Sequence, residues 1–278
     1  MGPTRADAAV DGLAEVWSSL AALGAALDDA SFDLPTECPG WTVKDQFSHV
    51  IGIELLLEGH PAPEVAAPIG DHVRNDLGRL NEQFVAARRD EPGRAVVAEL
   101  VALSARRLDA LRALDEEAWA ALGPSPIGIV PYVDYMGVRV FDSWVHEQDV
   151  RRATGRPGGR GGAGERVTLD RMEASMPYVL GRRVAAPLGA TLRVDVTGSL
   201  GRVVQLRVDA DEDGRARGVA TSTIAGAPTA SLRLDAETFA RRACGRIDAA
   251  AALAAPGTAL GGDRALAVAF VEHMAVTP

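Results

Sequence analysis

The first half of the chain repeats apolar residues at the spacing of amphipathic helices. Positions three and four apart share one face of a helix, so this spacing predicts helices that each bury one face. An antiparallel four-helix bundle is the simplest fold that covers the apolar faces of four long helices. Five segments show this pattern, and four long helices plus their connections account for the first half of the chain. The segments are approximately residues 4–29, 42–58, 74–89, 94–114 and 132–154.

Turn-forming residues separate these segments. Thr42 is a favourable N-cap, and Asp45 follows three residues later, as in a capping box. Residues 59–70 contain three prolines and are predicted to form a loop, of a length that is common in lids and binding loops. A second loop, residues 123–131, is rich in Gly and Pro and leads into the last long helix.

The pattern changes after the glycine-rich residues 155–164, whose composition is typical of a linker. Alternation of apolar and polar residues with period two then predicts strands, and these are interspersed with helical segments. The second half is therefore predicted to be a small α+β domain with an antiparallel sheet, and the predicted domains are residues 1–157 and 165–278. The expected strands are 191–196, 203–208, 219–224 and 231–234, and the expected helices are 168–180, 235–244 and 263–274.

Length, charge and cysteine content indicate which kinds of protein the chain could be. The length of 278 residues favours two domains, and the net charge of −9 argues against nucleic acid or anionic membranes, whose phosphates it would repel. The two cysteines, Cys38 and Cys244, are far apart, which favours a reducing cytoplasm over a disulfide framework. Neither a signal-peptide pattern nor an apolar run of about 20 residues is evident, so we expect a cytoplasmic protein. A monomer is the simplest expectation for its oligomeric state.

Asp142 and His146 are the most informative pair of polar residues in the chain. They stand four residues apart on the last predicted helix of the bundle, so their side chains lie on one face, one turn apart. A carboxylate and an imidazole in this arrangement can bind one metal ion together with a third ligand from another helix. His49, on the predicted helix 42–58, is the best candidate for that third ligand.

A simpler interpretation of each residue remains open. A carboxylate–histidine pair at this spacing is most often a hydrogen bond, and a single histidine in an apolar helix is most often a hydrogen-bonded core residue. Phe141, Trp144 and Val145 nevertheless predict a buried helix, and a buried carboxylate needs a partner such as a metal. Two histidines and one carboxylate leave a coordination position open, which suits a catalytic zinc site, with iron(II) as the competing metal.

The other candidate side chains carry less information. His60 and His72 flank the loop of residues 59–70 and are expected to be exposed, where either could contact a substrate. His273 is interpreted as structural, and Cys38 as a packing residue beside Trp41. The chain lacks a P-loop, a dinucleotide-binding fingerprint, a GxSxG elbow and a CxxC site.

Four segments together resemble the mycothiol-dependent maleylpyruvate isomerase family. They read CPGWTVKDQFSHV, RVFDSWVHEQDVRRATGRPG, ASLRLDAETFARRACGR and GDRALAVAFVEHMAVTP, and the resemblance covers nearly the whole chain. It implies a DinB-like metal-binding four-helix bundle followed by a sterol-carrier-like α+β domain. The first two segments are specific when they occur together in this order.

The resemblance also implies a ligand set and a thiol cofactor. The divalent metal, usually zinc, would be held by His49, Asp142 and His146, although the family's acidic ligand is a glutamate and Asp142 is one methylene shorter. Mycothiol would bind at the open metal position, where the metal lowers the pKa of the thiol. An arginine of the C-terminal domain would hold a substrate carboxylate, and Arg246 is the candidate, with Arg233 as the alternative.

Three functions are therefore compared. The leading hypothesis is a metal-dependent enzyme that uses mycothiol to isomerise or S-conjugate a small electrophilic substrate. The second is a thiol-independent metal hydrolase or a cyclase/isomerase of secondary metabolism on the same scaffold, because a fold does not determine a reaction. The third is a non-catalytic carrier of apolar ligands, against which the open ligand set argues.

Overall fold

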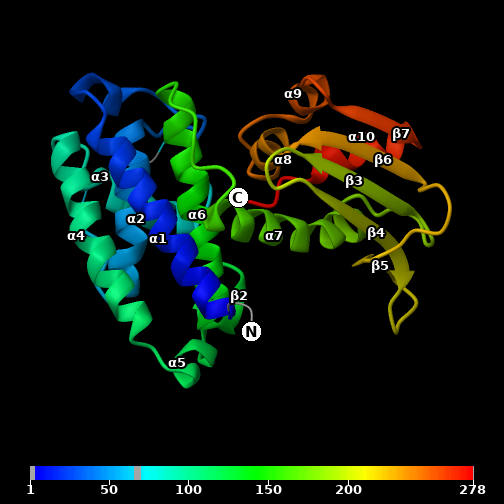
Figure 1. Ribbon diagram of the computed structural model, residues 1–278, viewed down its shortest axis with the longest axis horizontal. Coiled ribbons are helices and arrows are strands. Elements are labelled where there is room, and N and C mark those ends of the chain that lie inside the picture. Colours follow the sequence, from blue (N-terminus) through cyan, green and yellow to red (C-terminus); the bar gives the residue numbers. More distant parts are fainter. Residues whose placement is uncertain (1–3, 66–69, 278) are drawn as a thin grey trace. The chain divides into compact units, whose positions relative to one another are not determined.

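The computed structural model describes residues 4–65 and 70–277, and the chain divides into two compact units. The N-terminal unit is Met1–Thr168 and the C-terminal unit is Leu169–Pro278. The first unit is helical and the second contains a β-sheet, so the chain has the mixed α and β architecture that the sequence predicts (Figure 1). Within the described residues, no helix is long and apolar enough to cross a membrane.

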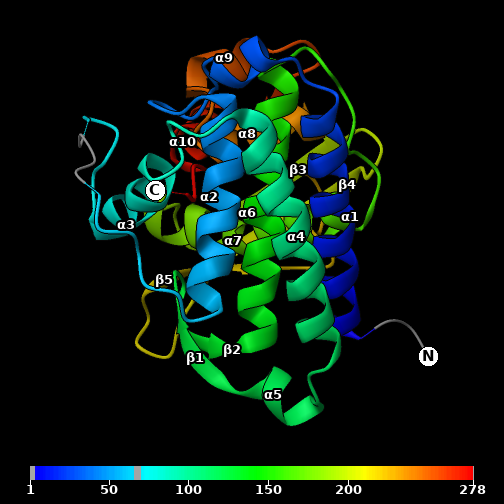
Figure 2. The same cartoon turned by 90° about the vertical axis from the view of Figure 1, so that its left-hand side faces the viewer.

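A bundle of four helices forms the N-terminal unit. Helices α1, α2, α4 and α6 pack against one another, and the shorter α3 packs on α2 (Figure 2). A short helix, α5, and a two-stranded hairpin, β1–β2, precede α6. The helices are α1 (Arg5–Ala25), α2 (Val43–Leu57), α3 (Asp76–Ala86), α4 (Gly93–Arg112), α5 (Glu116–Ala120) and α6 (Tyr132–Ala153), with β1 at Leu122–Ser125, β2 at Gly128–Pro131 and a 3₁₀ turn at Asp29–Asp33.

Contacts along α6 establish the helix directions. Trp17 Nε1 of α1 donates to Ser143 Oγ at 3.1 Å, and Ser19 Oγ donates to Glu147 at 2.6 Å, so α1 and α6 run in the same direction. Gln46 and Glu54 of α2 meet α6 in the opposite order, so α2 and α6 are antiparallel. The polar side chains of α2 therefore face those of α6 across the interior of the bundle.

The end of the bundle near the start of α2 is closely packed. Thr42 caps α2 with the predicted capping box, because its hydroxyl accepts from Asp45 N while the Asp45 carboxylate accepts from Thr42 N at 2.9 Å. Gly24 allows close approach of three helices, since an added Cβ would lie 2.6 Å from Val97 and 2.9 Å from Phe47. This packing holds the first turns of α2 in a defined position against α1 and α4.

The C-terminal unit has a five-stranded sheet with the strand order β5-β4-β3-β6-β7. The sheet is mixed, so the predicted fully antiparallel sheet is wrong: β3 and β6 pair in parallel, and the other neighbours are antiparallel. The physical reason is that residues 221–229 return the chain to the end of the sheet where β3 begins, and Ala230 pairs with Leu192. The strands are β3 (Thr191–Thr197), β4 (Arg202–Ala210), β5 (Ala216–Ala220), β6 (Ala230–Asp235) and β7 (Ala259–Gly262).

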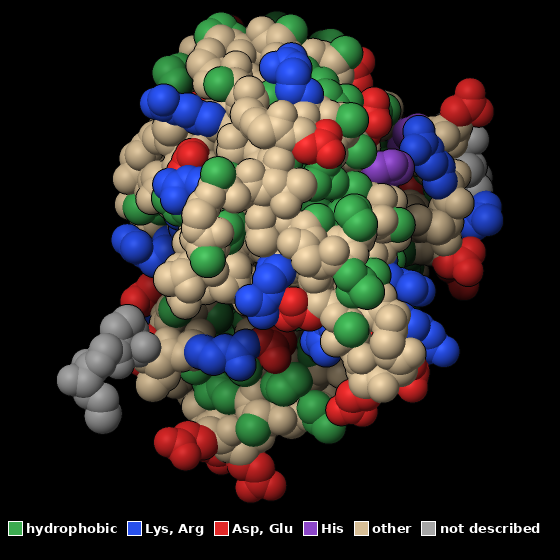
Figure 3. Space-filling view, turned by 90° about the vertical axis from the view of Figure 1, so that its right-hand side faces the viewer, with side chains coloured by type: hydrophobic (Ala, Val, Ile, Leu, Met, Phe, Trp, Pro, Cys, Tyr) green, Lys and Arg blue, Asp and Glu red, His purple; other side chains and the backbone are tan. Residues whose placement is uncertain are grey.

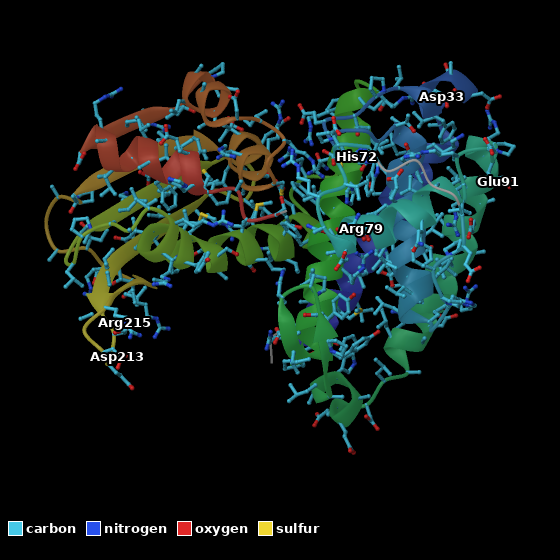
Figure 4. The ribbon with its side chains drawn as sticks, turned by 180° about the vertical axis from the view of Figure 1, so that it is seen from behind. Asp33, His72, Arg79, Glu91, Asp213 and Arg215 are labelled. Carbon is cyan, nitrogen blue, oxygen red and sulfur yellow. The ribbon has the colours of Figure 1, made fainter. Side chains whose placement is uncertain are left out.

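Helices cover the buried side chains of this sheet. The apolar residues of β3 are buried in alternation, as the period-two pattern predicts, and Asp235 caps α8 by accepting from Thr238 N at 2.9 Å. Asp213 and Arg215 form an ion pair of 3.0 Å at the tip of the β4–β5 hairpin (Figure 4). Acidic and basic side chains are interspersed over the face drawn in Figure 3. The helices are α7 (Ala163–Tyr178), which spans the division between the units, α8 (Ala236–Ala243), α9 (Ala249–Ala254) and α10 (Arg264–His273), with a π-helical turn at Val179–Arg183.

Two connecting segments differ from their expected structure. The glycine-rich residues 155–164 do not behave as a free linker, because Trp144 Nε1 donates to Gly159 O at 2.9 Å and Gln148 Nε2 donates to Gly158 O at 3.2 Å. The loop predicted at residues 123–131 contains the β1–β2 hairpin. Both differences arise because glycine and proline signal a break in a helix but not the contacts that the intervening backbone makes.

Candidate metal centre

His49, Asp142 and His146 meet in the interior of the N-terminal bundle. His49 projects from α2, and Asp142 and His146 project from successive turns of α6. Asp142 Oδ1 lies 3.3 Å from His49 Nε2 and 3.6 Å from His146 Nε2. One potential ligand atom from each residue lies within 4.8 Å of the other two. The structure thus brings together the three side chains that the sequence analysis selected.

A polar stripe on α6 accounts for the position of these side chains. Its residues are separated by four, three, four and three positions, which places them on one helical face. Most helices direct apolar side chains to a bundle core, whereas this face of α6 carries titratable groups into it. The stripe consists of Tyr135, Arg139, Asp142, His146 and Asp149.

The carboxylate of Asp142 accepts a hydrogen bond from a buried arginine. Arg139 Nη1 donates to Asp142 Oδ2 at 2.6 Å, and Arg139 Nε donates to Glu54 Oε1 at 2.8 Å. Glu54 in turn accepts from Arg107 Nε at 3.0 Å, so two carboxylates and two guanidinium groups balance in charge. Oδ2, which accepts from Arg139, also lies 3.1 Å from His49 Nε2, and Oδ1 is the oxygen that lies within 3.6 Å of both histidines.

Burial and charge act differently on the two histidines. Burial lowers the pKa of His49 to about 4, with further lowering by the charges of His146 and Arg139, so this imidazole is neutral near pH 7. Burial also disfavours the charged form of His146, but the carboxylates of Asp142 and Asp149 outweigh it and raise the pKa of that imidazole. The cations around Asp142 outweigh its burial and hold the pKa of its carboxyl well below the usual range.

Aromatic packing closes one side of the cluster. The ring centroid of Trp41 lies 5.0 Å from that of His49 and 5.8 Å from that of His146. The two imidazole rings meet edge-on, with their centroids 4.5 Å apart. Trp41 is itself held by Glu82, whose carboxylate accepts from its indole Nε1 at 3.0 Å. Both histidines are nearly fully buried, whereas the side chain of Asp142 is 25% exposed. Asp142 is therefore the member of the cluster that is most exposed to solvent.

The donor set and spacing fit a divalent metal. In a tetrahedral site with metal–ligand distances of about 2.0–2.1 Å, neighbouring donor atoms lie about 3.3 Å apart. The separations of 3.3 Å and 3.6 Å from Asp142 Oδ1 to the two histidine nitrogens are close to that value. Three ligands of this type leave at least one position open to another molecule.

The remaining candidates belong to other segments of the chain. Arg246 follows α8 in the C-terminal unit, where Nη1 donates to Cys244 O at 3.1 Å, and Arg233 is exposed on β6. His60 is exposed as expected. His72 (labelled in Figure 4) was expected to be exposed but is only 21% exposed, because its ring contacts Glu82 at 3.3 Å. His273 is exposed at the end of α10, and Cys38 is partly buried.

Several residues around the cluster were not selected from the sequence. Gln46 is hydrogen-bonded to His146, Arg139 donates to Asp142, and Glu54 accepts from Arg139. The available signal was spacing, since Arg139 lies three residues before Asp142 on the same face of the helix, and Gln46 lies three residues before His49. Spacing does not predict burial, and only the packing of α2 against α6 shows that these residues are buried.

The fold and this cluster define a two-unit protein with a candidate metal centre in a helical bundle. Residues 13–151 match the family described as "Mycothiol maleylpyruvate isomerase N-terminal domain", which is half of the chain. The protein therefore belongs to the mycothiol maleylpyruvate isomerase family. All three residues of the cluster lie within the matched segment.

Solved structures agree with this fold. The crystal structure of the mycothiol-dependent maleylpyruvate isomerase superposes with a TM-score of 0.54 at 17% identity, covering 90% of this chain and 91% of that chain. A histidine-to-alanine variant of the mycothiol-dependent maleylpyruvate isomerase gives a TM-score of 0.50 at 16% identity, with the same coverage. No curated protein sequence matched the chain. At such low identity these structures establish the fold and leave the reaction to be argued from the site.

Proposed function

We propose that the protein is a metal-dependent enzyme that uses mycothiol to isomerise or S-conjugate a small electrophilic substrate. The observation that carries this proposal is the convergence of His49, Asp142 and His146 inside a bundle of the isomerase family. A carrier of apolar ligands would not need two histidines and a carboxylate around an open position. A monomer in the cytoplasm, as expected from the sequence, is part of the same proposal.

The three side chains would hold the metal through His49 Nε2, Asp142 Oδ1 and His146 Nε2, and zinc is the metal we expect for these donors. A divalent cation at this position would lower the pKa of a thiol that binds it, which favours the nucleophilic thiolate at neutral pH. Arg139 keeps Asp142 ionised and turned toward the histidines. Trp41 shields the histidines from water on one side.

Asp142 differs from the glutamate of the family in length. A shorter carboxylate reaches less far from α6, and Arg139 already engages one of its oxygens. We therefore propose that Asp142 supplies a single oxygen to the metal rather than two. Arg139 would then act as the counter-cation of the second oxygen, which also lies 3.1 Å from His49 Nε2.

Arg246 is the proposed anion-binding residue of the reaction. A guanidinium group binds a carboxylate through two parallel hydrogen bonds, which suits an organic acid substrate. Arg246 Nη1 donates to Cys244 O at 3.1 Å, and Arg233 is the alternative, an exposed residue of β6. Comparing Arg246→Lys with Arg233→Lys separates these candidates, because only the arginine that binds substrate should raise KM when it is replaced.

The first experiment is elemental analysis of the purified protein and of two variants. About one zinc per chain is expected in the wild type, in line with one three-ligand site. The His146→Ala variant should lose the zinc, whereas His60→Ala, at an exposed histidine outside the cluster, should retain it. A wild-type protein that binds no metal even after zinc is added would contradict the proposal and favour the carrier function.

Turnover assays with and without mycothiol then test the thiol. Activity on electrophilic substrates should require mycothiol and should disappear in His146→Ala. Activity that persists without any thiol but still needs the metal would support a hydrolase or cyclase on this scaffold instead.

A further inference from the structure

The two ring nitrogens of His146 face different partners. Nε2 faces Asp142 Oδ1 at 3.6 Å, toward the proposed metal position. Nδ1 is hydrogen-bonded to Gln46 Oε1 and lies 3.6 Å from Asp149 Oδ2, on the opposite side of the ring. Since a neutral imidazole carries a single proton, the identity of the group at Nδ1 determines which nitrogen is left to bind a metal.

The orientation of the Gln46 amide follows from its other hydrogen bond. The oxygen and nitrogen of a glutamine amide are distinguished by their partners rather than by shape. Thr36 Oγ1 lies 2.9 Å from the carbonyl oxygen of Trp41 and 3.4 Å from that of Cys38, so its one hydrogen is directed to a backbone carbonyl. The hydroxyl oxygen must then accept from Gln46 Nε2, which lies 2.7 Å away. The amide oxygen of Gln46 is thereby turned toward His146.

We propose that Gln46, oriented by Thr36, is a positioning residue that fixes the tautomer of His146 with the proton on Nδ1. Gln46 Oε1 can only accept, so Nδ1 must donate, and the lone pair remains on Nε2. Asp149 is a second acceptor on the same side of the ring, and Arg152 holds it with a hydrogen bond of 2.6 Å. The inference rests on the proposed function only in assigning a metal to Nε2.

His49 lacks an equivalent arrangement. Its Nε2 faces Asp142, and its Nδ1 is buried without a hydrogen-bond partner among the described residues. When His49 Nε2 binds a metal, Nδ1 must carry the proton, and that buried N–H is left unpaired. His146 is thus the ligand prepared in advance by the protein, and Gln46 contributes more to metal affinity than any contact of His49 Nδ1.

Three variants and a control separate positioning from general packing. Gln46→Leu removes the acceptor, Gln46→Glu retains an acceptor oxygen at the same reach, and Thr36→Val removes the hydroxyl that orients the amide. Gln148→Leu is the matched control, because Gln148 is equally buried on α6 but donates to Gly158 O instead of contacting a histidine. All four are compared by circular dichroism and thermal unfolding to confirm that they fold.

The first readout is the tautomer of His146, measured by ¹⁵N NMR of metal-free protein at alkaline pH. The wild type, Gln46→Glu and Gln148→Leu should protonate Nδ1, and Gln46→Leu and Thr36→Val should show a mixture of tautomers. Protonation of Nε2 in the wild type would overturn the inference. This measurement needs neither metal nor mycothiol, so it decides the inference even if the proposed enzyme function fails.

The second readout is zinc affinity, measured by competition with a chelator. Loss of an outer-shell partner typically weakens metal binding about 10–100-fold, and we expect a loss in that range for Gln46→Leu. Thr36→Val should lose less, and Gln46→Glu should bind zinc at least as tightly as the wild type. Equal affinity in Gln46→Leu and Gln148→Leu would contradict the positioning role.

Discussion

Arg139 lies one turn before Asp142 on α6, and its Nη1 donates to Asp142 Oδ2 at 2.6 Å. Arg139 is almost fully buried and contacts Glu54 with its Nε, so it joins the two carboxylates inside the bundle. Asp142 is therefore ionised and oriented before any metal binds. The interior of the bundle therefore contains a network of ion pairs, and the loss of Arg139 would leave the carboxylates of Asp142 and Glu54 without this partner.

Replacement of Arg139 by Met should be strongly destabilising. The variant leaves Asp142 and Glu54 with fewer compensating charges, and removing one partner of a buried pair costs about 3–5 kcal/mol. Urea unfolding of the metal-free protein measures this loss. The control is Arg106→Met, because Arg106 of α4 pairs with Glu58 at the end of α2 but is largely exposed, and this substitution should cost at most about 1 kcal/mol. Equal losses of unfolding free energy in the two variants would show that the buried ion pairs stabilise the protein no more than an exposed one.

Substitutions at Asp142 test whether its single oxygen is a ligand. Asp142→Ala removes that oxygen, and we expect zinc affinity to fall by more than about 100-fold, beyond the effect of an outer-shell change. Asp142→Glu restores the carboxylate of the family and should retain zinc. Isothermal titration calorimetry with zinc provides the measurement, and retention of tight binding in Asp142→Ala would remove Asp142 from the ligand set.

The pKa of His49 predicts how the stability of the metal-free protein depends on pH. The pKa is 6.5 in the unfolded chain and about 4 in the folded chain, so between these values only the unfolded chain binds a proton at this residue. The free energy of unfolding should fall as the pH is lowered through this window, by up to about 1.4 kcal/mol per pH unit. His146 acts in the opposite sense, because its raised pKa contributes stability that is lost as the pH rises through it.

Urea unfolding in the presence of a chelator, repeated from about pH 7 to about pH 4, measures this slope. His49→Gln should flatten it, because glutamine is neutral at every pH. His60→Gln should leave it unchanged, since His60 is exposed. An unaltered slope in His49→Gln would mean that His49 does not titrate as a buried neutral group.

Trp41 should report on the metal site through its fluorescence. Its ring lies against both histidines, so a change in their protonation on metal binding alters the quenching of the indole. Addition of zinc to metal-free protein should change the tryptophan emission of the wild type and not that of Trp41→Phe. Trp119→Phe is the control, because Trp119 packs on Tyr132 instead of the histidines. A zinc response that persists in Trp41→Phe would place the metal elsewhere.

Much of the helical unit could be predicted from the sequence. The period of apolar residues located α1, α2, α4 and α6 to within a few residues, and Thr42 with Asp45 identified the start of α2. The spacing of Asp142 and His146 placed them on one face, since i and i+4 positions coincide on any helix. These features depend on neighbouring residues, which is why they can be read from a linear pattern.

Contacts between distant segments could not be predicted in the same way. Alternation in β3 and β6 indicated strands but not their parallel pairing, and the short strand β7 carried no recognisable pattern. Likewise, the sequence pattern did not indicate that Gln46, Arg139 and Glu54 are buried around the candidate ligands. Burial of a polar group depends on partners that lie far away in the chain.

The sequence by itself determined the helical and α+β halves, the residue types of a metal centre and the resemblance to a family. Only the tertiary structure decided that His49 meets Asp142, that Arg139 occupies one carboxylate oxygen and that Thr36 orients Gln46 toward His146. The physical reason is that helix periodicity is a local property, whereas the proton on an imidazole and the direction of a carboxylate are set by hydrogen bonds from residues up to about 100 positions away.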